Sequence, residues 1–301
     1  MKKLVFITIL TFICGLTASA QLVLPRESQR QEIIQTVGDT RIAVVYHRPN
    51  TKGRTNIFGC ASTDLIPKGG ATYECLVPNG QVWRTGANEN TTIEFSNDVK
   101  INGSALPAGK YGLHTIPNKD EWIVIFSKDN AKWGSFSYDE KQDQLRVRVK
   151  PPTAEMQEAM SLGFENVKPN TAEVVVRWEK LRVPFTVDIG DMPPRVLNYI
   201  REQMKTVKAD DFSSQVAGAR YVYDNKMTAG YAEAITWLDA FLQKRETVGA
   251  IALKANLLAD SGKTAEAIAT AEKALQVAQT ANPKPNTSAL EKKLAEWKAK
   301  K

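Results

Sequence analysis

Hydrophobic and polar residues alternate along most of residues 31–189, in the pattern that β-strands produce. In LRVRVK, residues 145–150, every second residue is apolar, which predicts a strand with one buried face. WIVIF, residues 122–126, is apolar throughout and suits a strand that is covered on both faces. Turn signals such as Asn102-Gly103 separate these runs. We therefore expect an antiparallel β-sandwich or a barrel-like domain.

The hydrophobic period changes to that of α-helices after residue 189. GDMPP, residues 190–194, marks the change, because its helix-breaking residues suit a linker and its prolines suit the start of a helix. The rest of the chain is rich in alanine and helical in pattern almost to its end. The sequence thus predicts an α+β protein with a β-rich domain at residues 21–190 and an all-α domain at residues 191–301.

The helical half contains an internal repeat. AEAI at residues 232–235 recurs at residues 265–268, an offset of 266 − 233 = 33 residues. ALKANLLADSGKTAEAIATAEKALQVA, residues 252–278, resembles the tetratricopeptide-repeat (TPR) family, whose helix pairs repeat about every 34 residues. The resemblance implies a surface for a protein partner, through docking, dimerisation or peptide capture.

The first twenty residues have the features of a signal peptide. MKKLVFITILTFICGLTASA combines two lysines, a short apolar stretch and small residues at Ala18 and Ala20. We expect cleavage near Ala20 and a periplasmic or extracellular protein that begins at Gln21. No later segment is long and apolar enough to predict a membrane span.

The composition excludes several classes of protein. The 301 residues are 43% hydrophobic and 24% charged, which indicates a folded chain, not a disordered one. Loss of Lys2 and Lys3 with the signal peptide lowers the formal net charge from +7 to +5, and the basic residues are scattered. Nucleic-acid binding would need a dense basic patch with stacking aromatic residues. We expect no metal site, because there are two histidines and no CxxC spacing, and no cofactor.

Two cysteines, Cys60 and Cys75, remain after cleavage of the signal peptide. An even pair that is close in sequence and lies in an oxidising compartment favours a disulfide over a metal site. We therefore predict a bond between them.

Three blocks of the strand-rich half resemble a known family. YHRPNTKGRTNIFG, LVPNGQVWRTGANENTTIEFS and LPAGKYGLHTIPNKDEWIVIFSK are similar to the secreted bacterial family called domain of unknown function 2911 (DUF2911), over roughly residues 25–190. The resemblance implies an exported β-rich domain but no activity and no catalytic residues. CASTDLIPKGGATYEC, residues 60–75, departs from the family pattern as an insertion that begins and ends with cysteine.

The stretch VWRTGANENTTIEFS holds the strongest candidates for a ligand site. Trp83 offers an apolar face, Arg84 a planar fork of donors, and Asn88 and Glu89 further donors and acceptors. The alternative is a scaffold turn, in which Trp83 lies in the core, Arg84 pairs with Glu89 or Glu94, and Asn88 bonds the backbone of the turn.

Two further candidates lie outside that stretch. Arg54 belongs to the basic loop HRPNTKGR, which would form an anion site if it lay near Arg84 and a solvated surface otherwise. His114 shares a predicted strand face with Gly112 and Ile116, so it is a candidate general base that reaches a cleft or a hydrogen-bonded structural histidine.

No nucleophile or phosphate-binding motif is present, which disfavours an enzyme. The leading hypothesis is an exported binding protein, with a β-domain for a small or envelope-derived ligand and helical repeats for a protein partner. The first alternative is an envelope hydrolase of glycans or peptides, with Glu89 or His114 as general acid or base and Arg84 orienting the substrate. The second is a purely structural assembly module.

Overall fold

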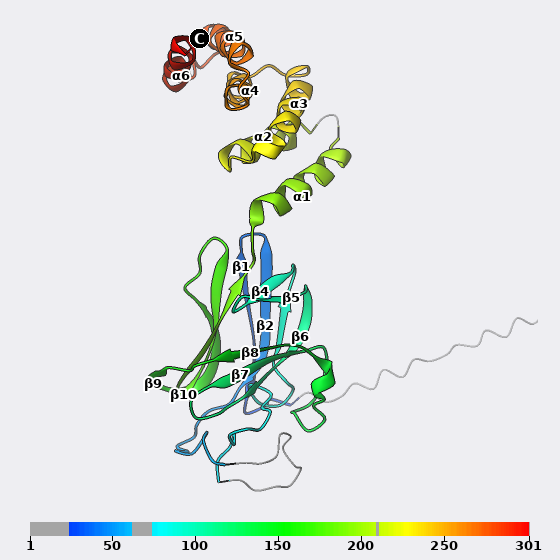
Figure 1. The fold of residues 1–301 in the computed structure, drawn as a ribbon, viewed down its shortest axis with the longest axis vertical. Coiled ribbons are helices and arrows are strands. Elements are labelled where there is room, and N and C mark those ends of the chain that lie inside the picture. Colours follow the sequence, from blue (N-terminus) through cyan, green and yellow to red (C-terminus); the bar gives the residue numbers. More distant parts are fainter. Residues whose placement is uncertain (1–23, 62–73, 209–210, 301) are drawn as a thin grey trace, which may run out of the picture.

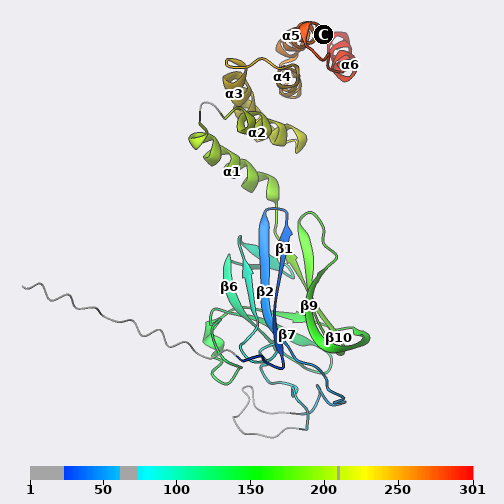
Figure 2. The same cartoon turned by 180° about the vertical axis from the view of Figure 1, so that it is seen from behind.

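A computed structural model describes residues 24–61, 74–208 and 211–300 of the chain. The β-strands and the α-helices lie at opposite ends of an elongated molecule (Figure 1). Figure 2 shows from behind that the helices continue beyond one end of the strands and do not cover them. The predicted α+β class is confirmed. The expected signal peptide lies outside the described residues.

Two antiparallel sheets make up the strand-rich half. The first has the order β1-β2-β3-β6-β7-β8 and the second the order β5-β4-β10-β9. Within the described residues neither sheet closes on itself, so the barrel alternative is wrong. The strands are β1 (Gln29–Val37), β2 (Thr40–Arg48), β3 (Thr92–Phe95), β4 (Val99–Ile101), β5 (Ser104–Leu106), β6 (Gly109–Ile116), β7 (Trp122–Ser127), β8 (Asp143–Val149), β9 (Thr153–Glu165) and β10 (Thr171–Asp188).

One hydrophobic core lies between the two sheets. Alternate residues of β2 and β10, such as Val44 and Val176, point into it and are almost fully buried. β7 is covered on both faces, as its continuous apolar sequence predicts. Val124 lies in the main core, and Ile125 packs on the other side with Ile116 and Tyr138.

Tight turns appear where the sequence predicts them. Asn102 and Gly103 join β4 to β5 with φ angles of 47° and 86°, in the left-handed region that these two residue types tolerate best. Gly38 joins β1 to β2, also with a positive φ.

Cys60 and Cys75 form the predicted disulfide. The backbone beside it adds a parallel bridge between Phe58 and Val77. Most of the predicted insertion, residues 62–73, lies outside the described residues, but both of its ends are joined at this point.

Removing the disulfide should destabilise the β-domain. The loop spans 75 − 60 = 15 residues, and the loss of its closure entropy predicts a drop of about 3 kcal/mol in the free energy of unfolding for the double variant Cys60→Ser, Cys75→Ser. Urea unfolding of the oxidised wild type and of the variant measures the difference. An unchanged midpoint would show that the bond does not restrict the unfolded chain.

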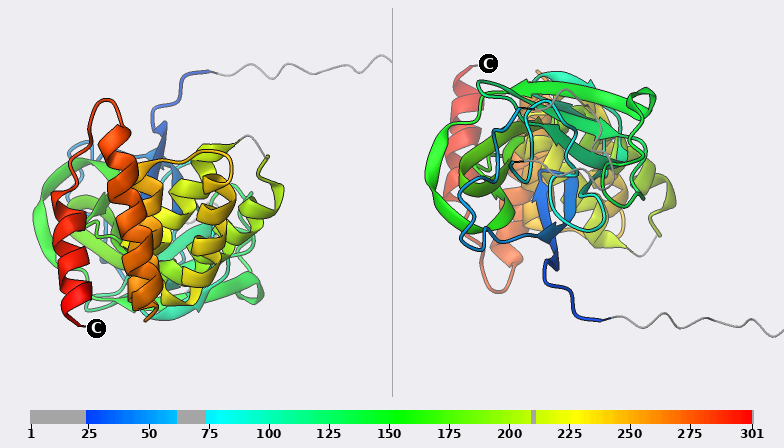
Figure 3. Two further views of the ribbon diagram at one scale, coloured as in Figure 1. Left: turned by 90° about the horizontal axis from the view of Figure 1, so that it is seen from above. Right: turned by 90° about the horizontal axis from the view of Figure 1, so that it is seen from below.

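Six helices follow the sheets. They run in order from α1, next to the strands, to α5 and α6 at the far end (Figure 1), and Figure 3 shows them from above. No helix in the described part of the chain is long and apolar enough to cross a lipid bilayer. The helices are α1 (Met192–Thr206), α2 (Phe212–Asp224), α3 (Tyr231–Leu242), α4 (Val248–Asp260), α5 (Thr264–Thr280) and α6 (Ser288–Ala299), with 3-10 turns η1 (Glu140–Gln142) and η2 (Thr228–Gly230).

Consecutive helices pack in pairs, α2 with α3 and α4 with α5. The two AEAI segments, residues 232–235 and 265–268, occupy the first turns of α3 and α5. Gly262 makes the turn between α4 and α5 with a φ of 78°, and Leu290 and Leu294 of α6 cover the end of the stack.

The connection between the two halves is shorter than the sequence predicts. α1 begins at Met192, so both prolines lie in its first turn, and only Gly190 and Asp191 follow the buried Ile189. Proline favours the first turn of a helix because the amide hydrogens there lack helical partners. The Arg195 guanidinium donates hydrogen bonds of 2.8 and 2.6 Å to Asp39 and ties α1 to the β1–β2 turn.

The two halves should fold independently, because the core between the sheets and the cores of the helical stack have no residue in common. A shortened protein of residues 21–191 should therefore unfold cooperatively in urea, with a midpoint close to that of the β-domain in the full chain. Circular dichroism at increasing urea measures it. A broad, non-cooperative transition would show that the helices complete the core between the sheets.

Candidate ligand pocket

A pocket of about 690 Å³ lies on the outer face of the six-stranded sheet. Tyr46, Ile93 and Tyr111 point into the core, so their neighbours on β2, β3 and β6 point outward. The pocket is lined by these outward residues, by the segment before β1, by the loop before β3 and by the loop after β7. The lining residues are Leu24, Pro25, Arg26, Gln29, Arg30, Val45, His47, Glu89, Asn90, Thr92, Lys110, Asn130, Ala131 and Lys132.

The loop of residues 84–91 leaves the edge of β6 and returns to it. Trp83 pairs with Thr115 through backbone hydrogen bonds of 2.7 and 2.9 Å, and the amide of Thr91 closes the loop by donating to the carbonyl of Arg84 at 3.1 Å. Between these points the loop extends to β2. Thr85 and Asn88 hold positive φ angles of 53° and 58°. Such backbone is maintained only where surrounding contacts enforce it, which is common at binding sites.

Trp83 provides the strongest of those contacts. Its ring is 9% exposed and stacks on Trp178 of β10 with centroids 5.8 Å apart. Its indole Nε1 donates a 3.1 Å hydrogen bond to the carbonyl of Gly86. Trp83 therefore supports the loop from below and does not face the pocket.

The loop after β7 runs beside the loop before β3 and forms the opposite wall. Glu89 and Trp133 pair as an antiparallel bridge. Asn90 and Lys132 join the two loops next to that bridge, because each backbone amide donates a 3.1 Å bond to the other residue. Gly112 lies beneath, where a Cβ atom would come within 2.5 Å of the carbonyl of Asp129, so only glycine fits.

The charges in the pocket centre on Glu89. The Arg26 guanidinium donates bonds of 2.8 and 2.6 Å to its two carboxylate oxygens and holds the pKa of Glu89 below its usual value. His47 Nε2 lies 3.4 Å from the same carboxylate, but burial lowers the pKa of His47. At neutral pH Glu89 is thus ionised and His47 neutral.

Arg84 and His114 both lie against the loop after β7, Arg84 near Gly134 and His114 near Ser135. His114 is 3% exposed, and its Nδ1 lies 3.4 Å from the Ser135 hydroxyl. Burial lowers the pKa of His114 to about 4. Burial also lowers the pKa of Arg84, whose Nε has no hydrogen-bond partner within the described residues. Neither side chain lines the pocket.

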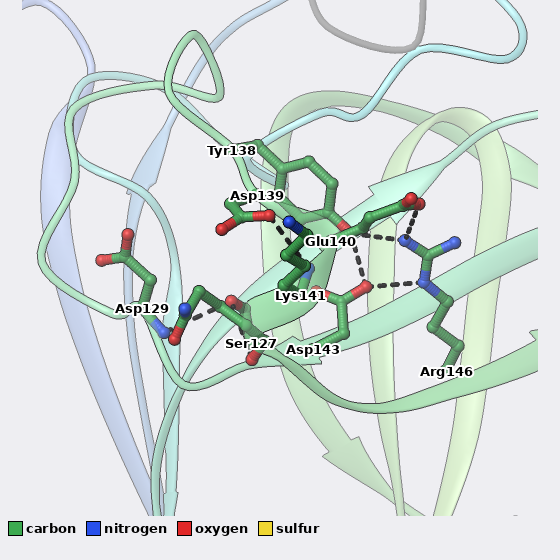
Figure 4. Close-up of polar contacts among 9 residues, drawn as sticks. Ser127, Asp129, Tyr138, Asp139, Glu140, Lys141, Asp143 and Arg146 are labelled. Carbon is green, nitrogen blue, oxygen red and sulfur yellow. Dashed lines mark hydrogen bonds and ion pairs between the residues drawn. The ribbon is translucent and has the colours of Figure 1, made fainter.

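A second polar cluster anchors the loop that covers them (Figure 4). The Tyr138 hydroxyl donates a 2.5 Å hydrogen bond to Asp143 at the start of β8, and Arg146 donates to both residues. Burial and the hydrogen bond to the Asp143 carboxylate raise the pKa of Tyr138, so the hydroxyl stays protonated. Tyr138 also packs on His114, so this cluster holds in place the loop that covers the buried histidine.

The candidates from the sequence are distributed over several places. Glu89 lines the pocket, whereas Asn88 donates to the carbonyl of Ser28 at 3.2 Å beside it. Arg54 bonds the carbonyl of Asn50 on the loop after β2 and lies outside the pocket. The partner of Glu89 is Arg26, and no ion pair of Arg84 with Glu89 or Glu94 exists in the part of the chain that the structure describes.

Sequence reasoning missed Arg26, Asn90, Lys110, Lys132 and Trp133. One signal was available, because a tryptophan in the polar segment KDNAKWGSFSYDE is unusual for a solvated loop. Trp133 is indeed 55% exposed.

Residues 28–187 match the family described as protein of unknown function (DUF2911). The chain belongs to this family. The family's match contains both sheets except Asp188, the last residue of β10, and all the pocket residues except Leu24, Pro25 and Arg26. No curated protein and no solved structure matches the chain. The family description assigns no function, so functional inference rests on the pocket itself.

Stability should fall in acid through His114. Its pKa is about 4 in the folded protein and about 6.5 when unfolded, so the unfolded chain binds the extra proton between these values and stability is lost as the pH falls through this window. The expected loss from this group between pH 8 and pH 5 is about 2 kcal/mol. Urea unfolding of wild type and His114→Gln at both pH values measures it. Equal pH dependence in the two proteins would contradict the assignment.

Proposed function

We propose that this protein is an exported binding protein whose β-domain holds a small acidic ligand in the pocket on its outer sheet face. The observation that carries the proposal is the charge of the pocket lining. Four cationic side chains face a single carboxylate, Glu89. Cationic side chains that gather around one pocket recognise carboxylate or phosphate groups.

Lys110 is the cation most available to a ligand. Arg26 is neutralised by Glu89, Arg30 pairs with Glu32 at 3.2 Å, and Lys132 lies 3.5 Å from Asp129. Lys110 forms no ion pair within the described residues. The side chains of Asn90, Thr92 and Asn130 add polar groups beside it.

The pKa shifts argue against the hydrolase alternative. A general acid at neutral pH needs a raised carboxyl pKa, whereas the pKa of Glu89 is lowered. A general base needs a free carboxylate oxygen, whereas both oxygens of Glu89 accept hydrogen bonds from Arg26. His114 is enclosed by Ser135 and Tyr138 and does not reach the pocket. Binding without chemistry therefore fits this pocket better.

We propose that the helical half is a short TPR-like stack that binds a protein partner. The 33-residue repeat and the matching positions of its two copies at the starts of α3 and α5 support this. Export is supported by the signal-like sequence of residues 1–20 and by the disulfide, which is typical of oxidising compartments.

A thermal-shift screen of the mature protein tests the ligand. Dicarboxylates, acidic sugars and inorganic phosphate should include a compound that raises the melting temperature, while neutral sugars do not. Lys110→Met should weaken the affinity for that compound about tenfold, the loss of one charge-assisted contact. Lys100→Met, an exposed lysine of β4 on the other sheet, is the matched control. Unchanged affinity in Lys110→Met would contradict the proposal.

A further inference from the structure

The segment before β1 forms a strap across one end of the pocket. Three of its residues, Leu24, Pro25 and Arg26, line the pocket, and the regular pairing of β1 begins only at Gln29. Leu24 is 64% exposed.

The strap is held mainly by polar side chains. Arg26 binds Glu89, Glu27 pairs with Lys52, and the Asn88 amide donates to the carbonyl of Ser28 at 3.2 Å. Contacts between exposed charges contribute little each, because water and salt screen them. The strap can therefore leave its place without disturbing the sheets.

The corner that receives Arg26 is, by contrast, formed by two loops whose backbones are bonded to each other. The Arg26 guanidinium lies 5.4 Å from the centre of the Trp133 ring while it donates to both oxygens of Glu89. Glu89 and Trp133 are held together by their backbone bridge. A carboxylate next to an aromatic face is complementary to a guanidinium or ammonium group. The Glu89–Trp133 corner is therefore formed before any ligand binds, and Arg26, which fills it, belongs to the weakly held strap.

We propose that this corner is a cation subsite, that Arg26 is its resident occupant, and that the guanidinium or ammonium group of a ligand replaces it. For the acidic group of the ligand, this inference rests on the proposed function. The acidic group would lie at Lys110, so the pocket suits a zwitterion such as a basic amino acid or a short peptide. Its volume of about 690 Å³ lies within the range for small-molecule sites.

Tethering makes Arg26 a strong competitor. A group attached through a short flexible segment has an effective concentration on the order of millimolar. A ligand that carries only a cationic group cannot displace Arg26 at concentrations below about millimolar. A zwitterion can, because it gains the contact with Lys110 that Arg26 does not make.

The test removes the Arg26 side chain from the corner and supplies a guanidinium group in solution. Arg26→Ala in the full mature protein should bind agmatine, which carries a guanidinium and no acid, as measured by isothermal titration calorimetry. Wild type should show no binding at the same concentration. Adding Glu89→Gln to Arg26→Ala should abolish agmatine binding. Arg54→Ala, which removes an exposed arginine outside the pocket, is the matched control and should behave as wild type.

Arginine tests the zwitterion. It should bind Arg26→Ala about tenfold more tightly than agmatine, and Lys110→Met in the same background should remove that advantage. Circular dichroism confirms that each variant is folded, and Arg26→Gln replaces Arg26→Ala if the alanine variant is not.

Two results would overturn the inference. Folded Arg26→Ala that binds no agmatine would show that Arg26 is only a structural tie. Arginine that binds no better than agmatine would refute the zwitterionic ligand. The proposed function is tested separately. Agmatine binding by Arg26→Ala does not require an acidic group on the ligand, whereas the compounds of the thermal-shift screen bind through one.

Discussion

The packing of Trp83 against Trp178 links the hydrophobic core to the pocket. Trp178 belongs to β10 of one sheet, whereas Trp83 pairs with β6 of the other, so the stacked rings join both sheets. Phe58 packs edge to face on both rings, and Trp122 packs edge to face on Trp83. The bond from the Trp83 indole to the backbone of Gly86 then extends this rigidity into the loop that carries Glu89. The energy of the core thus maintains positive φ angles that the loop alone would not adopt.

The outer sheet face has a buried layer and a solvent-accessible layer. Arg84 and His114 are in the buried layer, where desolvation lowers both pKa values. Glu89, Lys110 and Lys132 are in the accessible layer, where the ion pair with Arg26 holds the pKa of Glu89 below its usual value. The loop after β7 divides the two layers, and the Tyr138–Asp143–Arg146 cluster holds it in place. We therefore expect the pH dependence of stability and that of the proposed ligand binding to come from different groups.

The two halves of the molecule differ in how far apart in the sequence their contacting residues lie. The β-domain is a single core closed by contacts between residues far apart in sequence, whereas each helix of the stack contacts mainly its neighbours in the chain. A two-residue connection and the Arg195–Asp39 ion pair join them. In the proposed function, a partner on the helices would therefore leave the pocket unchanged.

The sequence alone determined what depends on neighbouring residues. The alternation of residues 145–150, the Asn102-Gly103 turn and the change of period at residue 189 predict strands, hairpins and helices because local geometry governs all three. The cysteine pair was predictable from its spacing and the expected compartment. The tertiary structure alone decided the pocket. Glu89 binds Arg26, 63 residues away, and not Arg84, because the fold turns Arg84 beneath the loop after β7. Local pattern contains no information on such pairs, since two distant segments meet only where the packing of the whole core places them.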